Sequence, residues 1–129
     1  MALLLDAHSL IWWLADDRRL SAAARESIAT ADRPLVGAGT LVEIAVKRSL
    51  GKLEIADDWT EQTQADGFSI LPISLPHVAR LQALAYPSVA GRVHRDPFDR
   101  LLAAQALNDG IAIVTCDAAL SAYGASVVW

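Results

Sequence analysis

Short apolar runs alternate along the chain with longer segments in which apolar residues recur at helical spacing. Residues 2–5 (ALLL) are wholly apolar and stop at Asp6, a pattern that predicts a strand buried on both faces of a sheet. Further strands are predicted by apolar, turn-bounded runs at residues 34–39, 68–74, 111–117 and 126–129. Buried strands of this kind are typical of parallel sheets.

The segments between these strands carry the start and stop signals of helices. Ser21 and Asp96 are typical N-cap residues, Pro97 suits a first helical turn, and Gly51 suits a C-terminal stop. The predicted helices cover residues 9–15, 22–31, 40–51, 57 or 58 to 67, 76–84 and 96–110, with a short helix or turn at 118–124. A loop is expected at residues 86–95.

Strands that alternate with helices predict an α/β fold. We expect one domain over residues 1–129, a three-layer α/β/α arrangement with a mainly parallel central sheet. In such a sheet the ligand site lies at the carboxyl ends of the strands. Asp6 and Asp117 each end a predicted strand, so both belong to that edge.

Composition narrows the class of protein. The chain is 53% hydrophobic and 20% charged, which is ordinary for one soluble domain with a real core. A net charge of -4 disfavours a protein that grips nucleic acid by its overall charge. The single cysteine, Cys116, cannot form an internal disulfide and is expected as a small core residue. No leader or membrane span is recognised, so we expect a cytoplasmic protein with no membrane role.

Four carboxylates are the candidate chemical groups. Asp6 and Asp117 follow strands, while Glu43 and Asp99 are expected in the first turns of two helices, and Asp99 falls within an apolar arc. All four can reach one sheet edge, where their charges would repel unless a cation neutralises them. Oxygen ligands without a His or Cys cluster favour Mg²⁺ or Mn²⁺. Such a site suits hydrolysis of a phosphodiester.

Each acid also has a purely structural interpretation. Glu43 follows Thr40 as a T-x-x-E capping box and precedes Lys47 as an i,i+4 ion pair. Asp96 and Asp99 fit an N-cap and a first-turn acid, and the N-cap is the favoured role of Asp96 over contact with a metal or its water. Asp6 and Asp117 equally suit caps or turns at strand ends. Only the joint pattern favours a metal site.

Other polar residues near the acids are candidates for supporting roles. The Thr115 hydroxyl, two residues before Asp117, could orient a carboxylate or a water. Contacts to RNA phosphates are expected from Arg92, Arg95, Arg100 and Lys47, which would give affinity without reading bases. Solvated surface charge is the alternative for each of these four. His8 and His94 show no orienting partner in the sequence, so polar loop or cap roles are expected for them.

With these residues identified, the chain resembles the PIN-domain family, and within it the VapC-type toxins of type II toxin-antitoxin pairs. LLLDAHSLIWWLADDRRLS resembles the opening of the family, with Asp6 as its first acid. LVEIAVKRSLGKL carries the second acid, Glu43, HRDPFDRLLAAQA the third, Asp99, and IAIVTCD the fourth, Asp117. The chain has Gly39 before Thr40 where many relatives have Ala-Ser or Ser-Ser.

This resemblance implies a function. It implies a Mg²⁺- or Mn²⁺-dependent endoribonuclease that cuts single-stranded regions of RNA such as tRNA or rRNA. It also implies inhibition by a cognate VapB-type antitoxin and a homodimer.

Two other functions use the same acids. A Mg²⁺-dependent phosphoryl-transfer or receiver-like domain would need a phosphoacceptor Asp after a middle strand and a Lys after a late one. Residues 68–74 and 111–117 supply neither. A non-enzymatic interaction module, in which the acids only cap helices, is the other alternative.

Overall fold

A computed structural model describes residues 1–129, which build one five-stranded sheet with helices on both faces. Its strands are β1 (Ala2–Leu5), β2 (Arg33–Gly37), β3 (Ser69–Leu71), β6 (Ala112–Val114) and β7 (Val127–Val128). Their order is β3-β2-β1-β6-β7, and every pairing is parallel. The predicted α/β class with a parallel central sheet is confirmed.

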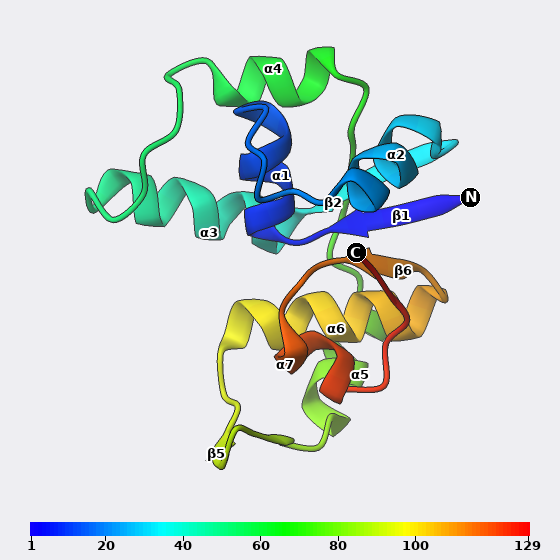
Figure 1. The fold of residues 1–129 in the computed structure, drawn as a ribbon. Helices are drawn as coiled ribbons and strands as arrows, with labels where there is room; N and C mark the ends of the chain where they lie inside the picture. The colour runs from blue at the N-terminus through cyan, green and yellow to red at the C-terminus, as the bar shows by residue number, and fades with distance from the viewer.

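Seven helices surround this sheet. They are α1 (Ala7–Leu14), α2 (Ala22–Thr30), α3 (Ala38–Ser49), α4 (Trp59–Ala65), α5 (Leu75–Ala83), α6 (Pro97–Asp109) and α7 (Ala118–Ala122). Figure 1 shows α1, α2 and α4 on one side of β1 and α5, α6 and α7 on the other. None of them has the length and apolar character needed to cross a membrane.

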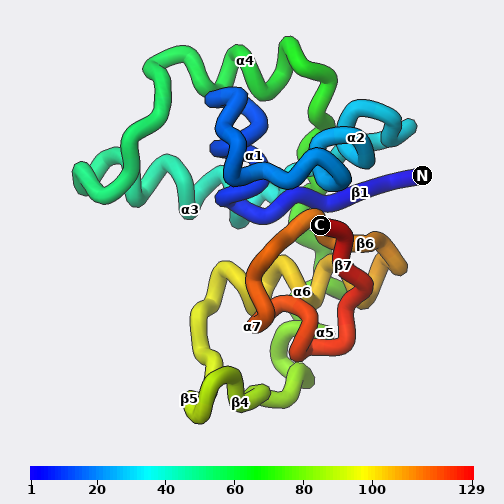
Figure 2. The backbone as a smooth tube through the Cα atoms, viewed as in Figure 1, coloured from blue at the N-terminus to red at the C-terminus, as the bar shows by residue number.

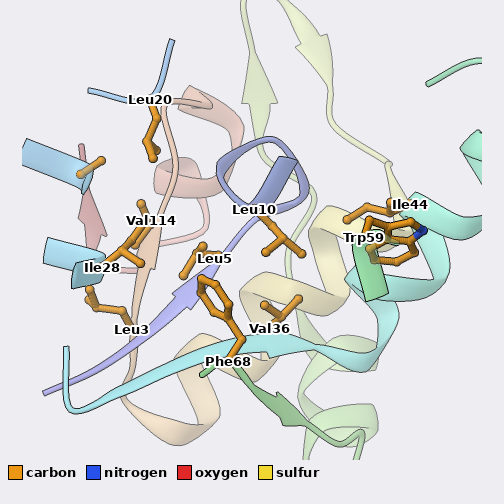
Figure 3. Packing of buried hydrophobic residues seen from close by; sticks show 11 residues of the cluster. Leu3, Leu5, Leu10, Leu20, Ile28, Val36, Ile44, Trp59, Phe68 and Val114 are labelled. Carbon is orange, nitrogen blue, oxygen red and sulfur yellow. The ribbon is translucent and has the colours of Figure 1, made fainter. Parts of the chain in front are cut away.

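The apolar pattern of β1 is explained by burial on both faces. Leu3 and Leu5 join the core beneath α1 and α2, where Figure 3 shows them with Val36 and Phe68. Leu4 points to the opposite face and joins a second cluster with residues of α6 and α7. Since side chains of a strand alternate between faces, a strand covered on both sides must be apolar throughout.

The strand order also fixes where a ligand site can form. The chain runs outward from β1 through β2 to β3, then returns to place β6 on the other side of β1. This reversal creates a crevice at the carboxyl ends of β1 and β6. Leu5 pairs with Val114 there, so Asp6 and Thr115 leave neighbouring strands at the same level.

The start of α3 differs from the prediction. The helix begins at Ala38, and its N-cap, Gly37, makes no side-chain cap hydrogen bond. The predicted capping box is therefore wrong: Thr40 lies inside the helix, and Glu43 lies in its second turn rather than its first. Gly39 packs the first turn of the helix against α6, where an added Cβ would lie 2.5 Å from the Leu101 Cδ2 and a larger residue would require that side chain to move.

The expected loop at residues 86–95 contains a small hairpin, β4 (Ser88–Val89) and β5 (Arg92–Val93). Ala90 and Gly91 have φ values of 51° and 78° at its turn, the backbone that a tight type I′ hairpin requires. The hairpin lies on the far side of the molecule from α4 (Figure 2). Because alanine occupies the first turn position, the sequence lacks the Asn-Gly or Gly-Gly pair that usually indicates such a hairpin.

The last long strand is shorter than predicted. β6 ends at Val114, and Cys116 is exposed in the segment that follows. Its prediction as a buried core residue is therefore wrong. The Thr115 backbone N–H still donates to the Val128 carbonyl of β7 at 3.1 Å, and beyond Thr115 the chain turns away from the sheet.

Candidate active site

The four acids singled out from the sequence line one pit of about 270 Å³ at the carboxyl edge of the sheet. Its charged lining residues are Asp6, Glu43, Asp96, Asp99, Asp117, Lys47 and Lys52. Asp6 follows β1, Glu43 comes from α3, and Asp99 comes from α6. Five carboxylates and two ammonium groups therefore share one concave surface, which gives it net negative charge.

Asp6 is held most tightly of the acids. It is 8% exposed, its Oδ1 accepts from the Ser9 backbone N–H at 2.8 Å, and its Oδ2 accepts from the Thr115 hydroxyl at 2.6 Å. The same Thr115 oxygen accepts from the Asp117 backbone N–H at 2.9 Å. Thr115 thus ties the first acid to the segment that carries the fourth, across the junction of β1 and β6.

Two further acids combine a capping role with a place in the pit. Asp117 Oδ1 accepts from the Ala119 N–H at 2.9 Å and caps α7. Asp96 Oδ1 accepts from the N–H groups of Phe98 and Asp99 at 2.9 and 3.0 Å and caps α6, as the sequence predicted. One oxygen of each carboxylate makes these bonds, so capping and a role in the pit do not exclude each other.

Glu43 forms an ion pair with Lys47 on the same helix. Its side chain is 9% exposed, and its Oε2 lies 2.9 Å from the Lys47 ammonium, the predicted i,i+4 pair. The bond to Glu43 raises the pKa of Lys47, and the charges of Asp96 and Asp99 act in the same direction. Lys47 is therefore charged and lies inside the acidic pit.

Asp99 carries the clearest electrostatic signature. Burial raises its pKa to about 6, and the charges of Asp96, Asp117 and Glu43 contribute in the same direction. A hydrogen bond from His94 opposes this shift. The neighbouring negative charges disfavour ionisation of Asp99. A cation bound at this position would be attracted by all of these carboxylates.

His94 has partners that the sequence did not reveal. Its Nε2 lies 3.2 Å from Asp99 Oδ2, and its Nδ1 lies 2.6 Å from the Tyr123 hydroxyl. Tyr123 follows α7 and is separated from His94 by 29 residues, so no local motif could have linked them. His94 lies in a loop, as expected, but it has two orienting partners that the sequence does not show.

The arginines expected at phosphates separate into two groups. Arg92 and Arg95 are exposed on and beside the β4–β5 hairpin. Arg100 is only 5% exposed, and its guanidinium donates to the carbonyl oxygens of Leu84 and Ala85 at 3.0 and 2.9 Å. These bonds join α6 to the end of α5, so Arg100 stabilises the fold, and its buried guanidinium does not face a phosphate as the sequence had predicted.

The donor chemistry of the pit fits a hard divalent cation. Glu43, Asp96, Asp99 and Asp117 each keep one carboxylate oxygen that makes no hydrogen bond within the protein. No three or more His, Cys, Asp or Glu side chains stand close enough to hold a metal ion without moving. Repulsion between the negative charges favours this separation of the carboxylates, and a bound cation would remove that repulsion.

Comparison with known proteins identifies the family. The model of the PIN domain matches residues 3–125, so the chain belongs to the PIN-domain family. It is 31% identical over 120 residues to ribonuclease VapC22 of Mycobacterium tuberculosis (strain ATCC 25618 / H37Rv), and the match covers 93% of this chain and 90% of that protein. The resemblance drawn from the four acidic segments is confirmed.

Solved structures show the same fold. The VapBC2 structure from Rickettsia felis, bound to a DNA fragment from its promoter, matches with a TM-score of 0.69 at 14% identity, over 98% of this chain and 97% of that chain. FitAcB from Neisseria gonorrhoeae matches with a TM-score of 0.65 at 15% identity, over 97% and 95% of the two chains. Neither the phosphoryl-transfer domain nor the interaction module gains support from these comparisons.

Proposed function

We propose that this chain is a metal-dependent endoribonuclease toxin of a type II toxin-antitoxin pair. The observation that carries the proposal is the convergence of Asp6, Glu43, Asp99 and Asp117 from four separate segments on one pit. Membership of the PIN-domain family and similarity to a VapC ribonuclease support it.

Mg²⁺ or Mn²⁺ would be held by Asp6, Glu43, Asp99 and Asp117, with Asp96 near its water shell. A divalent cation at such a site supplies water of lowered pKa and stabilises charge on a phosphoryl oxygen. The protein itself orients the carboxylates toward the pit. Thr115 fixes Asp6 through its 2.6 Å hydrogen bond, and the caps of α6 and α7 fix Asp96 and Asp117.

The substrate is RNA of the tRNA or rRNA class, contacted mainly through its backbone. Lys47, which lies within the pit and is paired with Glu43, would supply positive charge to a phosphate of the bound strand. Arg92 and Arg95 extend positive charge along the hairpin. Contacts of this kind position a strand but carry little sequence choice.

RNA cleavage by the wild type and by Asp6→Asn, with and without Mg²⁺, tests this function. We expect cleavage only by the wild type with Mg²⁺, because the substitution removes a charge from the pit. Asp58→Asn is the matched control, since Asp58 is exposed and makes no side-chain cap bond. Equal rates for wild type and Asp6→Asn, or equal rates with and without Mg²⁺, would contradict the proposal.

We propose a VapB-type antitoxin as the inhibitory partner, with a basic side chain that enters the acidic pit and an apolar segment that covers a separate groove. That groove is lined by Leu41, Trp59, Phe68 and Ile70 and by the polar residues Thr60, Thr63, Gln64 and Ser69. Val42, Val46 and Leu50 are exposed at successive i,i+4 positions along α3 and at its C-cap, and this apolar stripe supports a homodimer. Co-expression of the antitoxin with this chain should preserve the integrity of cellular RNA. Sedimentation of the purified chain should show a dimer.

A further inference from the structure

His94 lies where the β4–β5 hairpin joins α6, and its ring faces into the protein. Its side chain is 15% exposed, whereas the adjacent Arg95 is exposed. Its backbone N–H donates to the Pro87 carbonyl at 2.9 Å, which closes the base of the hairpin. The ring therefore occupies a fixed place between the pit acid Asp99 and Tyr123, 3.2 Å from one and 2.6 Å from the other.

Arg100, Tyr123, His94 and Asp99 form a row of contacts, and its chemistry allows one arrangement of protons when Asp99 is ionised and the His94 imidazole is neutral. Arg100 can only donate, and its Nη1 lies 3.5 Å from the Tyr123 hydroxyl. A carboxylate can only accept, so the His94 Nε2 must carry a proton directed at Asp99. His94 Nδ1 is then an acceptor and receives the Tyr123 O–H. Every donor points from the guanidinium toward the pit.

Arg100, at the far end of this row, is held by several contacts. Arg100 stacks on the Tyr86 ring at 3.7 Å from its centroid, in addition to its two carbonyl bonds. The Tyr123 ring packs against the His94 ring with centroids 5.5 Å apart at 75°. The His94 ring thus has a hydrogen-bond partner at each nitrogen and an aromatic neighbour, which restricts rotation of the group that contacts Asp99.

We propose that His94 is a positioning residue for Asp99, with Tyr123 and Arg100 as its supports. By binding Oδ2, His94 leaves Oδ1 of Asp99 for a divalent cation in the pit. This role rests on the proposed function of the pit. Groups that orient a metal-binding carboxylate commonly contribute 10- to 100-fold to metal affinity.

Mn²⁺ binding by His94→Leu, measured by titration calorimetry on the full chain, tests the proposal. We expect affinity to fall roughly 10- to 100-fold, as for other groups that orient a metal ligand. His94→Gln is the conservative variant, because its amide N–H can reach the position of Nε2, and it should bind Mn²⁺ nearly as well as the wild type. Tyr123→Phe, which removes one hydroxyl and keeps the ring, should show a smaller loss than His94→Leu.

Thermal melting without metal separates positioning from folding. If His94 only packs, the Leu and Gln variants lose stability without a selective loss of Mn²⁺ affinity, and the proposal is overturned. Equal Mn²⁺ affinity of His94→Leu and wild type overturns it as well, while RNA cleavage by the wild type leaves the function intact. A wild type that binds no Mn²⁺ and cuts no RNA overturns both proposals.

Discussion

Replacing Asp99 by Asn should stabilise the metal-free protein while abolishing its activity. The pKa of Asp99 is raised from 3.8 to about 6 by burial and by the charges of Asp96 and Asp117. Ionising this carboxyl in the folded state therefore costs roughly 3 kcal/mol at neutral pH. The Asn amide has almost the same shape, carries no charge, and can still accept the hydrogen bond from His94 with its oxygen.

The measured gain should be about 1–3 kcal/mol at pH 7.5, since solvent reaching the pit screens part of the repulsion. For a chain of this length, 1 kcal/mol corresponds to roughly 4 °C in the melting temperature. We therefore expect Asp99→Asn to melt about 4 to 12 °C above the wild type in a chelator. Thermal unfolding followed by circular dichroism measures this shift.

The pH dependence gives the sharper test. Below the unfolded pKa of 3.8, Asp99 is protonated in both states and the advantage of Asn disappears. As pH rises toward about 6, the folded wild type retains a proton that the unfolded chain has lost, so its stability falls relative to the variant. Above that range the full difference is present, and at pH 4.5 only about a third of it remains.

Mn²⁺ should reduce the difference, because a cation bound by the wild type removes the repulsion and stabilises the folded state. Asp58→Asn serves as the matched control and should stay within about 0.5 kcal/mol of the wild type at every pH. The reasoning is refuted if Asp99→Asn melts below the wild type at pH 7.5 in a chelator. A gain that is the same at pH 4.5 and 7.5 would also refute it.

Three other substitutions probe the surroundings of the pit. Thr115→Val should cost about 2–4 kcal/mol in denaturant unfolding, because it leaves a buried acid oxygen and a backbone N–H without their partner. Arg100→Met should cost about 2–4 kcal/mol, because two carbonyls lose their donor. Ala90→Asn should add up to about 1 kcal/mol, because Asn tolerates the φ of 51° better than Ala does. Unchanged stability of Thr115→Val or Arg100→Met would contradict the proposed role of that side chain's hydrogen bonds. A loss of stability in Ala90→Asn would contradict the argument from the backbone φ angle.

The boundaries that were mispredicted have a common physical cause. Sequence signals placed the start of the Glu43 helix at Thr40, but the helix begins at Ala38 and its first turn packs against α6, with Gly39 next to Leu101. Thr115 and Cys116 read as continuing an apolar strand, yet the Thr115 hydroxyl bonds to Asp6 and the strand ends at Val114. In both places a contact between distant segments outweighed local preference.

The sequence by itself determined the order of the helices and of the five strands of the central sheet, because apolar periodicity and capping residues act within a few neighbours along the chain. It also determined which acids could meet, since strand-end positions such as Asp6 and Asp117 follow from parallel topology. Only the tertiary structure decided that Arg100 is buried and that His94 joins Tyr123 to Asp99. The partners of those side chains are 15 or more residues away or on other elements, and burial and hydrogen bonding depend on which elements pack together.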